Sequence, residues 1–221
     1  MAEGNAAIME QQALKRKSDV HLARKIWHCA GICLMAAFYN TFGAKLSWIS
    51  TLAIGVVFIP LDYLRLRRPR LNRVITRIFG PVMREHELAS LSGTSYLLLG
   101  GYFLLLVNER HVVTLTLLFL AFGDPMASFF GIRYGKDRIL GNKTLQGTVA
   151  AFFVCTAIAA VYYYSNNLMT ERLLIVAPIS GLIGALAELM PIGKLDDNLT
   201  FPMVGCSLLW MLFKVYGGFG P

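Results

Sequence analysis

Residues 112–132 read VVTLTLLFLAFGDPMASFFGI, and this stretch decides the fold class. At a rise of 1.5 Å per residue, its apolar first half, 112–122, covers about 16 Å of helix, roughly half of a hydrocarbon core about 30 Å thick. Asp124 and Pro125 then interrupt the run, and a second apolar stretch follows. The length predicts a membrane helix, and the carboxylate inside it marks a candidate functional position.

Similar apolar runs fill most of the remaining chain. Of its 221 residues, 56% are hydrophobic and 15% are charged, which is far to the apolar side of soluble domains. The other runs lie at 26–42, 46–61, 94–107, 145–164, 173–190 and 199–215. We therefore expect an all-α, polytopic integral membrane protein with about seven transmembrane helices. Residues 1–25 are expected to form a basic cytoplasmic segment that is not a cleaved signal peptide, and 26–221 a single transmembrane catalytic domain.

The basic residues are distributed unevenly along this predicted topology. If the N-terminus is cytoplasmic, all but four of the 21 Lys and Arg residues fall on the cytoplasmic side, and the exceptions are Lys45, Arg110, Arg172 and Lys214. This bias fits the positive-inside rule and predicts a C-terminus on the opposite side. The net charge of +8 thus indicates orientation and attraction to anionic headgroups, and no nucleic-acid partner is needed to explain it.

The longest connection, 65–88, has the pattern of an amphipathic helix. Apolar residues recur at helical spacing between arginines, at Leu71, Val74, Ile75, Ile78 and Phe79. Such a helix is typical of the membrane interface, where it lies in the plane of the bilayer.

Two acids are predicted at one depth in the cytoplasmic half of the membrane. Asp124 follows 112–122, and Glu188 lies about 22 Å along the segment that begins at 173. Together they suit Mg²⁺, which prefers one or two carboxylates plus water and phosphate oxygens. The alternatives stay open: Asp124 is also a normal N-cap before proline, and Glu188 also suits an ion pair with a cation such as Lys194.

Two polar loops adjoin these acids. Residues 131–148, GIRYGKDRILGNKTLQGT, combine glycines, cations and hydroxyls before a helix start, which favours phosphate binding, although no Walker pattern is present. Residues 191–202, PIGKLDDNLTFP, hold adjacent acids and an amide. That pattern suits metal or ribose recognition and equally suits a solvated turn with an N-cap.

At these loops the chain resembles the CTP-dependent lipid kinases, the family of dolichol kinase, phytol kinase and fungal-type diacylglycerol kinase. The matching pieces are 123–128 (GDPMAS), 131–135 (GIRYG), 141–148 (GNKTLQGT), Glu188 and 196–202 (DDNLTFP). Weaker echoes are Arg24-Lys25-x-x-His28, 62–66 with 71–72, and Arg84-x-x-Glu87 with Gly93. One departure is Gln146, where the family usually has Glu, so we assign no catalytic role to that position.

The resemblance implies transfer of the γ-phosphate of CTP, or another nucleoside triphosphate, to the hydroxyl of a membrane lipid such as diacylglycerol, dolichol, polyprenol or phytol. It implies Asp124 as metal ligand or base, with Lys143 and Arg133 as catalytic contacts to the phosphates. Further nucleotide contacts are expected from Thr144, Thr148, Lys136 and Asn198, and Mg²⁺ ligation from Asp124, Glu188 and Asp197.

Three residues of the first segment, Arg24, Lys25 and His28, are expected to complete the phosphate site. A topological role for Arg24 and Lys25, and a helix-end role for His28, remain alternatives. Competing functions are a CTP:phosphatidate cytidylyltransferase, which would share lipid, nucleotide and metal, and a membrane transporter. The transporter is disfavoured because the outer loops are short and carry few acids.

Overall fold

The computed structural model describes residues 22–190 and 195–219, and helices form nearly all of them. The helices are α2 (Leu22–Arg67), α3 (Pro69–Phe79), α4 (Gly93–Val107), α5 (Arg110–Leu118), α6 (Asp124–Tyr134), α7 (Leu145–Ser165), α8 (Leu173–Leu189) and α9 (Asp197–Tyr216). Five helical stretches in the described part are long and apolar enough to cross a membrane, and Gly93–Val107 is a shorter apolar helix. The predicted class of helical membrane protein is confirmed.

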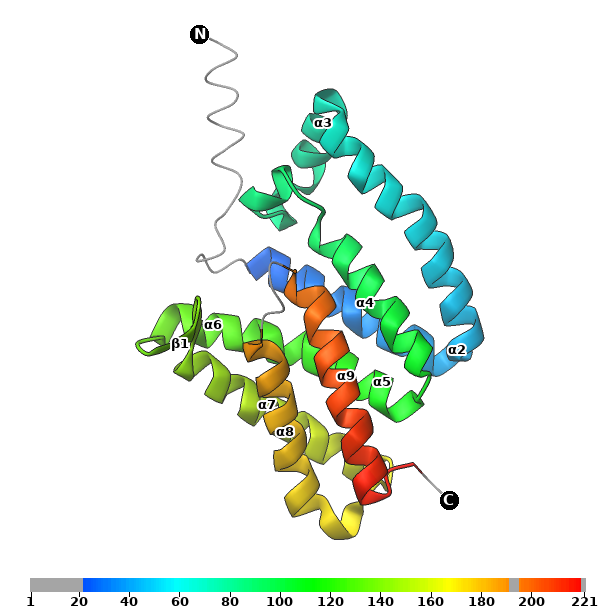
Figure 1. Cartoon of the computed structure of the whole chain (residues 1–221), viewed down its shortest axis with the longest axis vertical. Helices are drawn as coiled ribbons and strands as arrows, with labels where there is room; N and C mark the ends of the chain where they lie inside the picture. Colours follow the sequence, from blue (N-terminus) through cyan, green and yellow to red (C-terminus); the bar gives the residue numbers. More distant parts are fainter. Residues whose placement is uncertain (1–21, 191–194, 220–221) are drawn as a thin grey trace.

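Helix α2 bends sharply at Gly43, which separates the predicted segments 26–42 and 46–61. Gly43 has φ 77°, a left-handed conformation that glycine adopts without the steric penalty of a Cβ. The two arms diverge from this point, and α4 lies between them (Figure 1). The Trp48 indole donates to the Leu105 carbonyl and the Tyr102 hydroxyl donates to the Thr51 carbonyl, so α4 is bonded to the second arm.

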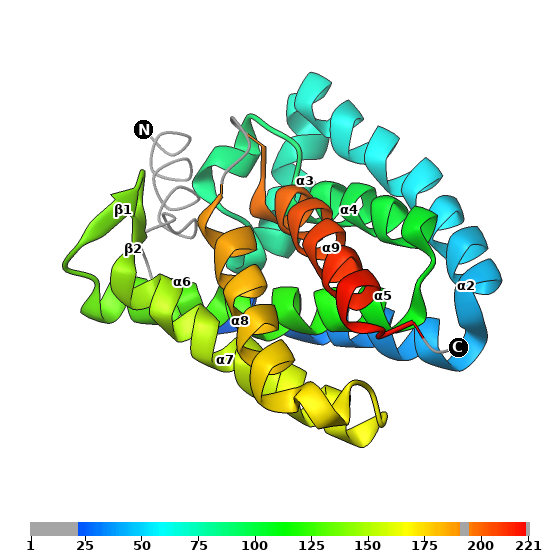
Figure 2. The same ribbon diagram turned by 60° about the horizontal axis from the view of Figure 1, so that its bottom comes forward.

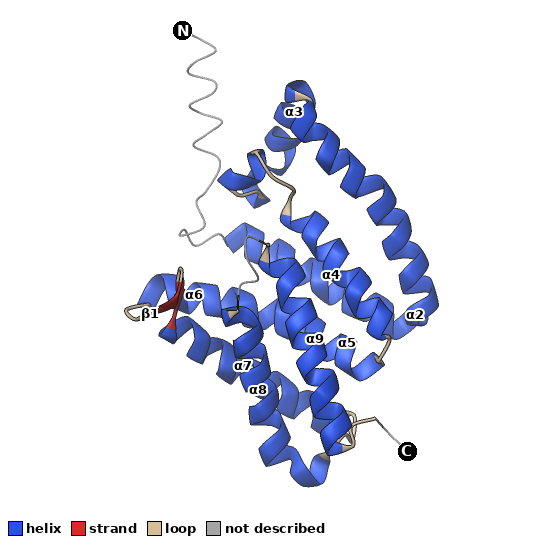
Figure 3. Ribbon diagram, viewed as in Figure 1, coloured by secondary structure: helices blue, strands red, loops and turns tan. Residues whose placement is uncertain are grey.

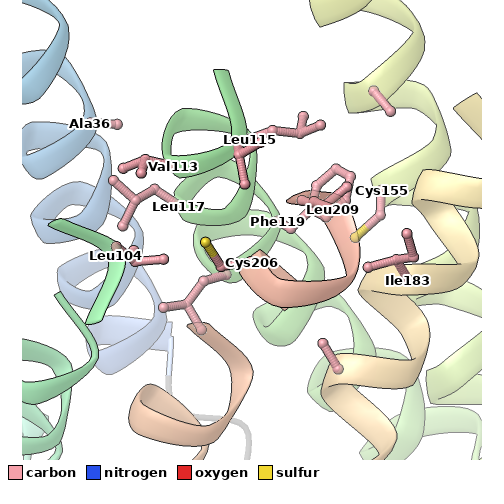
Figure 4. Close-up of a cluster of buried hydrophobic side chains, with 14 of the residues drawn as sticks. Ala36, Leu104, Val113, Leu115, Leu117, Phe119, Cys155, Ile183, Cys206 and Leu209 are labelled. Carbon is pink, nitrogen blue, oxygen red and sulfur yellow. The ribbon is translucent and has the colours of Figure 1, made fainter. Parts of the chain in front are cut away.

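The apolar core surrounds α5. Val112 and Leu115 are completely buried, and side chains from α2, α4, α7, α8 and α9 converge on this helix (Figure 4). Cys155 of α7 and Cys206 of α9 are also fully buried there. Because α5 is enclosed by other helices, it holds the following segment, with Asp124, inside the bundle.

The helical path is not broken at the predicted interruption 123–125, which a π-helical turn directly precedes. The turn spans Phe119–Gly123 and joins α5 to α6. Pro125 has no N–H to donate, and the extra residue of a π-turn accommodates such a gap. In a π-helical turn the N–H of residue 125 would donate to the Leu120 carbonyl, but proline has no N–H. His28 Nε2 lies 3.3 Å from that carbonyl oxygen instead. The N-cap alternative for Asp124 is wrong, because Asp124 has helical dihedrals and Gly123 occupies the cap position without a side-chain bond.

A short hairpin is the one departure from the all-α expectation within the described residues (Figure 3). Strands β1 (Arg138–Leu140) and β2 (Lys143–Thr144) pair antiparallel across the turn residues Gly141 and Asn142, with Gly141 at φ 56°. The Gln146 amide closes the base of this hairpin. It accepts from the backbone N–H groups of Lys136 and Asp137 and donates to the Asp137 carboxylate.

The predicted amphipathic segment is α3, which Gly80–Val82 and Glu85–Leu88, two 3-10 turns, connect towards α4. A buried polar network, here called the sealed cluster, fastens this connection to α2 and α4. Its members are Asp62, Arg65, Asn72, Ser92 and Ser95. The Arg65 guanidinium also donates to the Ser90 carbonyl, and the Asn72 amide donates to the Leu88 carbonyl.

Candidate functional site

A cavity of about 630 Å³ is lined by residues from the starts of α7 and α9 and from the end of α8. These three helix ends lie at one end of the bundle (Figure 2). Its charged lining residues are Arg84, Asp124, Lys136, Arg138, Lys143, Glu188 and Asp197. The volume lies in the usual range for ligand sites. Both signs of charge face one cavity, which suits an anionic ligand accompanied by a cation.

Lys143 is at the centre of a group that we call the open cluster, formed with Glu188 and Asp197. The Lys143 Nζ lies 2.6 Å from Glu188 Oε1 and 3.3 Å from Asp197 Oδ2. Burial by itself lowers the pKa of the Lys143 ammonium, but the charges of Asp197, Glu188 and then Asp124 outweigh it and hold that pKa above its usual range. Lys143 is therefore protonated at neutral pH. The alternative partner for Glu188, Lys194, lies outside the described residues.

Asp124 lines this cavity and also a smaller pocket beside it, of about 40 Å³. Its carboxylate Oδ2 is 4.0 Å from His28 Nε2, and its side chain is 20% exposed. Asp124 begins α6, and α6 lies against α7 because Gly147 has no side chain. A Cβ there would lie 2.7 Å from the Ala127 carbonyl oxygen. The acid is thus fixed at the junction between the two spaces.

Arg24, Lys25 and His28 all line the smaller pocket, as the predicted phosphate site requires. Each also has a protein partner. Arg24 Nη1 donates to Glu87 Oε1 at 3.0 Å and to the Val82 carbonyl, while Lys25 Nζ donates to the Pro125 carbonyl. The bonds of Lys25 to Pro125 and of His28 to Leu120 join the first helix to the segment that carries Asp124.

Thr144, Thr148 and Asn198, the predicted polar contacts, each make a hydrogen bond within the protein. Thr144 lines the cavity and caps α7 by accepting from the Gly147 N–H, and Thr148 donates to the Thr144 carbonyl. Asn198 lines the smaller pocket, and its amide donates to the Gly93 carbonyl at the start of α4.

The two predicted cations of the hairpin region differ in placement. Lys136 lines the cavity. Arg133 is exposed, donates to the Tyr134 hydroxyl and stacks over that ring, and it is absent from the lining of both spaces. Two further arginines, Arg84 and Arg138, line the cavity although the sequence motifs predicted no ligand contact for them. For Arg84 the only sequence signal was the echo Arg84-x-x-Glu87.

The chain is similar to CTP-dependent diacylglycerol kinase 1 of Schizosaccharomyces pombe, with 32% identity over 172 residues that cover 72% of this chain and 79% of the relative. The chain belongs to the CTP-dependent lipid kinase family. The protein of the same name from Saccharomyces cerevisiae is 27% identical over 88% of this chain and 74% of its own length. The S. cerevisiae dolichol kinase is 29% identical over 88% of this chain, which covers only 38% of that larger protein.

No protein-family profile and no solved structure matches the chain. The resemblance predicted from the loop motifs is nevertheless confirmed by these relatives. Because the chain belongs to the CTP-dependent lipid kinase family, the cavity at the end of the helical bundle is the candidate active site.

Proposed function

We propose that this protein transfers the γ-phosphoryl group of CTP to the hydroxyl of a membrane lipid alcohol, with diacylglycerol as the first candidate. The observation that carries the proposal is the position of the open cluster. A cation between two acids faces a nucleotide-sized cavity, and that cavity adjoins a carboxylate within an apolar helix. The relatives named for diacylglycerol favour that lipid over dolichol, because this chain covers most of their length.

The donor side of the reaction is assigned to the hairpin and the start of α7. Lys136, Arg138 and Lys143 bring three cations to the cavity. Cations neutralise the charge of a triphosphate, and phosphoryl transfer depends mainly on positioning and electrostatic stabilisation. Lys143 is the best placed of the three, since its own partners fix it between α8 and α9.

The same cavity supports a magnesium site. Within the described residues no three acidic, histidine or cysteine side chains cluster closely enough to form a complete protein cage. Two carboxylates, Glu188 and Asp197, already face one cation, the Lys143 ammonium. This donor set fits Mg²⁺, which takes one or two carboxylates and completes its shell with phosphate and water oxygens. When bound, the ion would neutralise charge on the phosphates.

The acceptor side is assigned to Asp124. A lipid alcohol carries its hydroxyl near the membrane interface, and Asp124 lines the cavity from within the candidate membrane span Arg110–Tyr134. In the proposed step the lipid oxygen forms a bond to the γ-phosphorus, the bond from that phosphorus to the bridging oxygen breaks, and CDP leaves. The hydroxyl proton passes to the Asp124 carboxylate, acting as general base.

The proposed topology has seven crossings. The two arms of α2 and the short helix α4 are counted separately, and α3 lies in the plane of the interface. The described chain begins and ends at opposite ends of the bundle (Figure 1). With the basic residues inside, the N-terminus and the cavity are cytoplasmic, where CTP is available. Labelling of single cysteines introduced into the polar loops tests this arrangement; accessibility of the 131–148 loop from the outside would invert it.

Labelled CTP tests the reaction itself. Purified protein in nanodiscs is incubated with diacylglycerol, dolichol or phytol and with CTP labelled at the γ- or the α-phosphate. We expect the γ-label to enter diacylglycerol, with release of CDP. Appearance of the α-label in a lipid product together with pyrophosphate would instead establish a cytidylyltransferase. Absence of lipid labelling from either position would contradict both activities.

A further inference from the structure

Arg84 lies where the large cavity meets the small pocket, and it lines both. The other basic residues divide between the two spaces: Arg24, Lys25 and His28 line the small pocket, and Lys136, Arg138 and Lys143 line the cavity. Within residues 22–190 and 195–219, no other basic side chain lines both. Asp124 is shared in the same way, so Arg84 and the proposed base face one junction.

The backbone of Arg84 is hydrogen-bonded to Glu87, which two helices hold in place. Its N–H donates to Glu87 Oε2, and Glu87 Oε1 accepts from Arg24 of α2 and from the Gly93 N–H of α4. The sealed cluster fastens the other end of the same connection, through the Arg65 bond to the Ser90 carbonyl. These bonds fix the start of the Arg84 side chain relative to Asp124.

The guanidinium of Arg84, in contrast, has no close acceptor among the described residues. Its nearest acidic partner is Asp196, at 3.7 Å between Nη1 and Oδ2, which is longer than a hydrogen bond. Arg24 and Arg65 donate to several acceptors at 2.6 to 3.0 Å. A guanidinium that is 18% exposed, lines a pocket and has no acceptor at hydrogen-bond distance within the described chain can accept an anion as a partner.

We propose that Arg84 binds the phosphoryl group during transfer, between the nucleotide in the cavity and the lipid hydroxyl beside Asp124. The inference rests on the proposed function. In such a transfer, negative charge is spread over the three oxygens that do not react, and the two N–H groups on one edge of a guanidinium match a pair of those oxygens. Because the contact is strongest in the transition state, Arg84 contributes to kcat more than to CTP affinity.

The test compares Arg84→Ala, Arg84→Gln and Arg84→Lys in nanodiscs. We expect Arg84→Ala and Arg84→Gln to lower kcat by about 100-fold or more, while the dissociation constant for CTP rises by less than about tenfold. Arg84→Lys should have a higher kcat than Arg84→Ala, since lysine keeps the positive charge but lacks the paired N–H groups of the guanidinium. Arg68→Ala, an exposed arginine between α2 and α3, is the matched control and should retain kcat.

Asp196→Asn separates a phosphoryl contact from a structural ion pair. Asparagine keeps the ability to cap α9, where Asp196 Oδ1 accepts from the Asn198 N–H, but removes the charge opposite Arg84. We expect its kcat to fall no more than about threefold. An equal loss in Asp196→Asn and Arg84→Ala, or a loss of thermal stability that accounts for the lost turnover, would overturn the proposal.

A binding measurement distinguishes this inference from the proposed function. CDP with aluminium fluoride mimics a planar phosphoryl group in transit and needs no turnover. We expect wild-type protein to bind CDP more tightly when aluminium fluoride is present, and Arg84→Ala to lose that gain while binding CDP itself nearly normally. Unchanged enhancement in Arg84→Ala would refute the role of Arg84 even if kinase activity is found. Absence of lipid phosphorylation would instead refute the proposed function.

Discussion

The sealed cluster sets one acid against a cation, and the open cluster sets two acids against a cation. In the sealed cluster the Asp62 and Arg65 side chains are 4% and 1% exposed, and Arg65 Nε donates to Asp62 at 2.6 Å. The remaining Asp62 oxygen accepts from Ser92 and Ser95. In the open cluster Lys143 and Asp197 are 20% and 18% exposed and face a cavity of about 630 Å³.

The difference shows how to separate a structural ion pair from a reactive one. Charges that are fully hydrogen-bonded and have no adjoining space can fix helices but cannot receive a ligand. Charges that face an enclosed space can exchange their protein partners for ligand atoms. Mutations in the open cluster should therefore change chemistry and leave folding intact, and mutations in the sealed cluster should do the reverse.

The largest expected effect is on turnover, at the acid beside the open cluster. Asp124→Asn keeps the size of the side chain but removes the charge that a proton or a metal ion needs. We expect γ-phosphate transfer to fall by about 10³-fold or more, with no loss of thermal stability. Retained turnover in nanodiscs would return Asp124 to a structural role.

The sealed cluster should respond through stability. Arg65→Met leaves the Asp62 carboxylate buried without its cation, so we expect a loss of about 3–5 kcal/mol in the free energy of unfolding, measured by denaturant titration in mixed micelles. Arg67→Met, two residues away and exposed, is the matched control and should lose less than about 1 kcal/mol.

A double variant sharpens this result. Asp62→Leu combined with Arg65→Met leaves no unpaired charge, so it should be less destabilised than Arg65→Met alone. Folded Arg65→Met protein should keep its CTP affinity within about threefold. If Arg65→Met lost much of its CTP affinity while its stability was unchanged, the sealed cluster would not be purely structural, and the distinction between the two clusters would be wrong.

A smaller effect is expected on the metal requirement. Glu188→Gln removes one of the two carboxylates that face Lys143, and we expect the Mg²⁺ concentration for half-maximal activity to rise by about tenfold or more. Saturating Mg²⁺ should restore part of the activity. Glu171→Gln, an exposed acid at the other end of the bundle, should leave the Mg²⁺ dependence unchanged. Equal dependence in both variants would exclude Glu188 as a ligand.

The smallest effect is expected at the base of the hairpin. Gln146→Glu restores the residue that is usual in the family and still accepts from the Lys136 and Asp137 N–H groups. The variant loses the hydrogen bond that the Gln146 amide donates to the Asp137 carboxylate, and it places two negative charges together at an exposed position. We expect turnover within about threefold of wild type. A loss as large as that of Asp124→Asn would mean that position 146 contacts the reacting groups.

The sequence predicted the helices well because a membrane helix must satisfy its backbone internally over a fixed thickness. Helices α4 and α7 begin and end within one residue of the predicted 94–107 and 145–164. The breaks at 43–45 and at Asp124-Pro125 were predicted from the ends of the apolar runs, but their form was not: a left-handed glycine bends α2, and a π-turn keeps the path through Asp124 helical.

The site was predictable as a set of residue types but not as a set of contacts. Lys143, Glu188 and Asp197 belong to three elements, and no periodicity along the chain relates them. Arg133 and Arg84 illustrate the limit. Both are arginines near predicted functional motifs, yet Arg133 stacks on Tyr134 and Arg84 lines the cavity. Arg84 reaches the cavity because the 80–92 connection packs against α2 and α4, and that packing could not be predicted from the sequence.

A nucleotide-binding titration tests most directly the central claim that the open cluster holds the phosphates of CTP. Lys143→Ala and Arg68→Ala are titrated in nanodiscs with CTP, CDP and cytidine at fixed salt. A charge-assisted bond to phosphate contributes about 1.5–3 kcal/mol, so Lys143→Ala should raise the dissociation constants for CTP and CDP by roughly tenfold or more and leave that for cytidine nearly unchanged. Arg68→Ala should change none of them. Equal losses for cytidine and CTP in Lys143→Ala, or a larger loss in Arg68→Ala, would contradict the account.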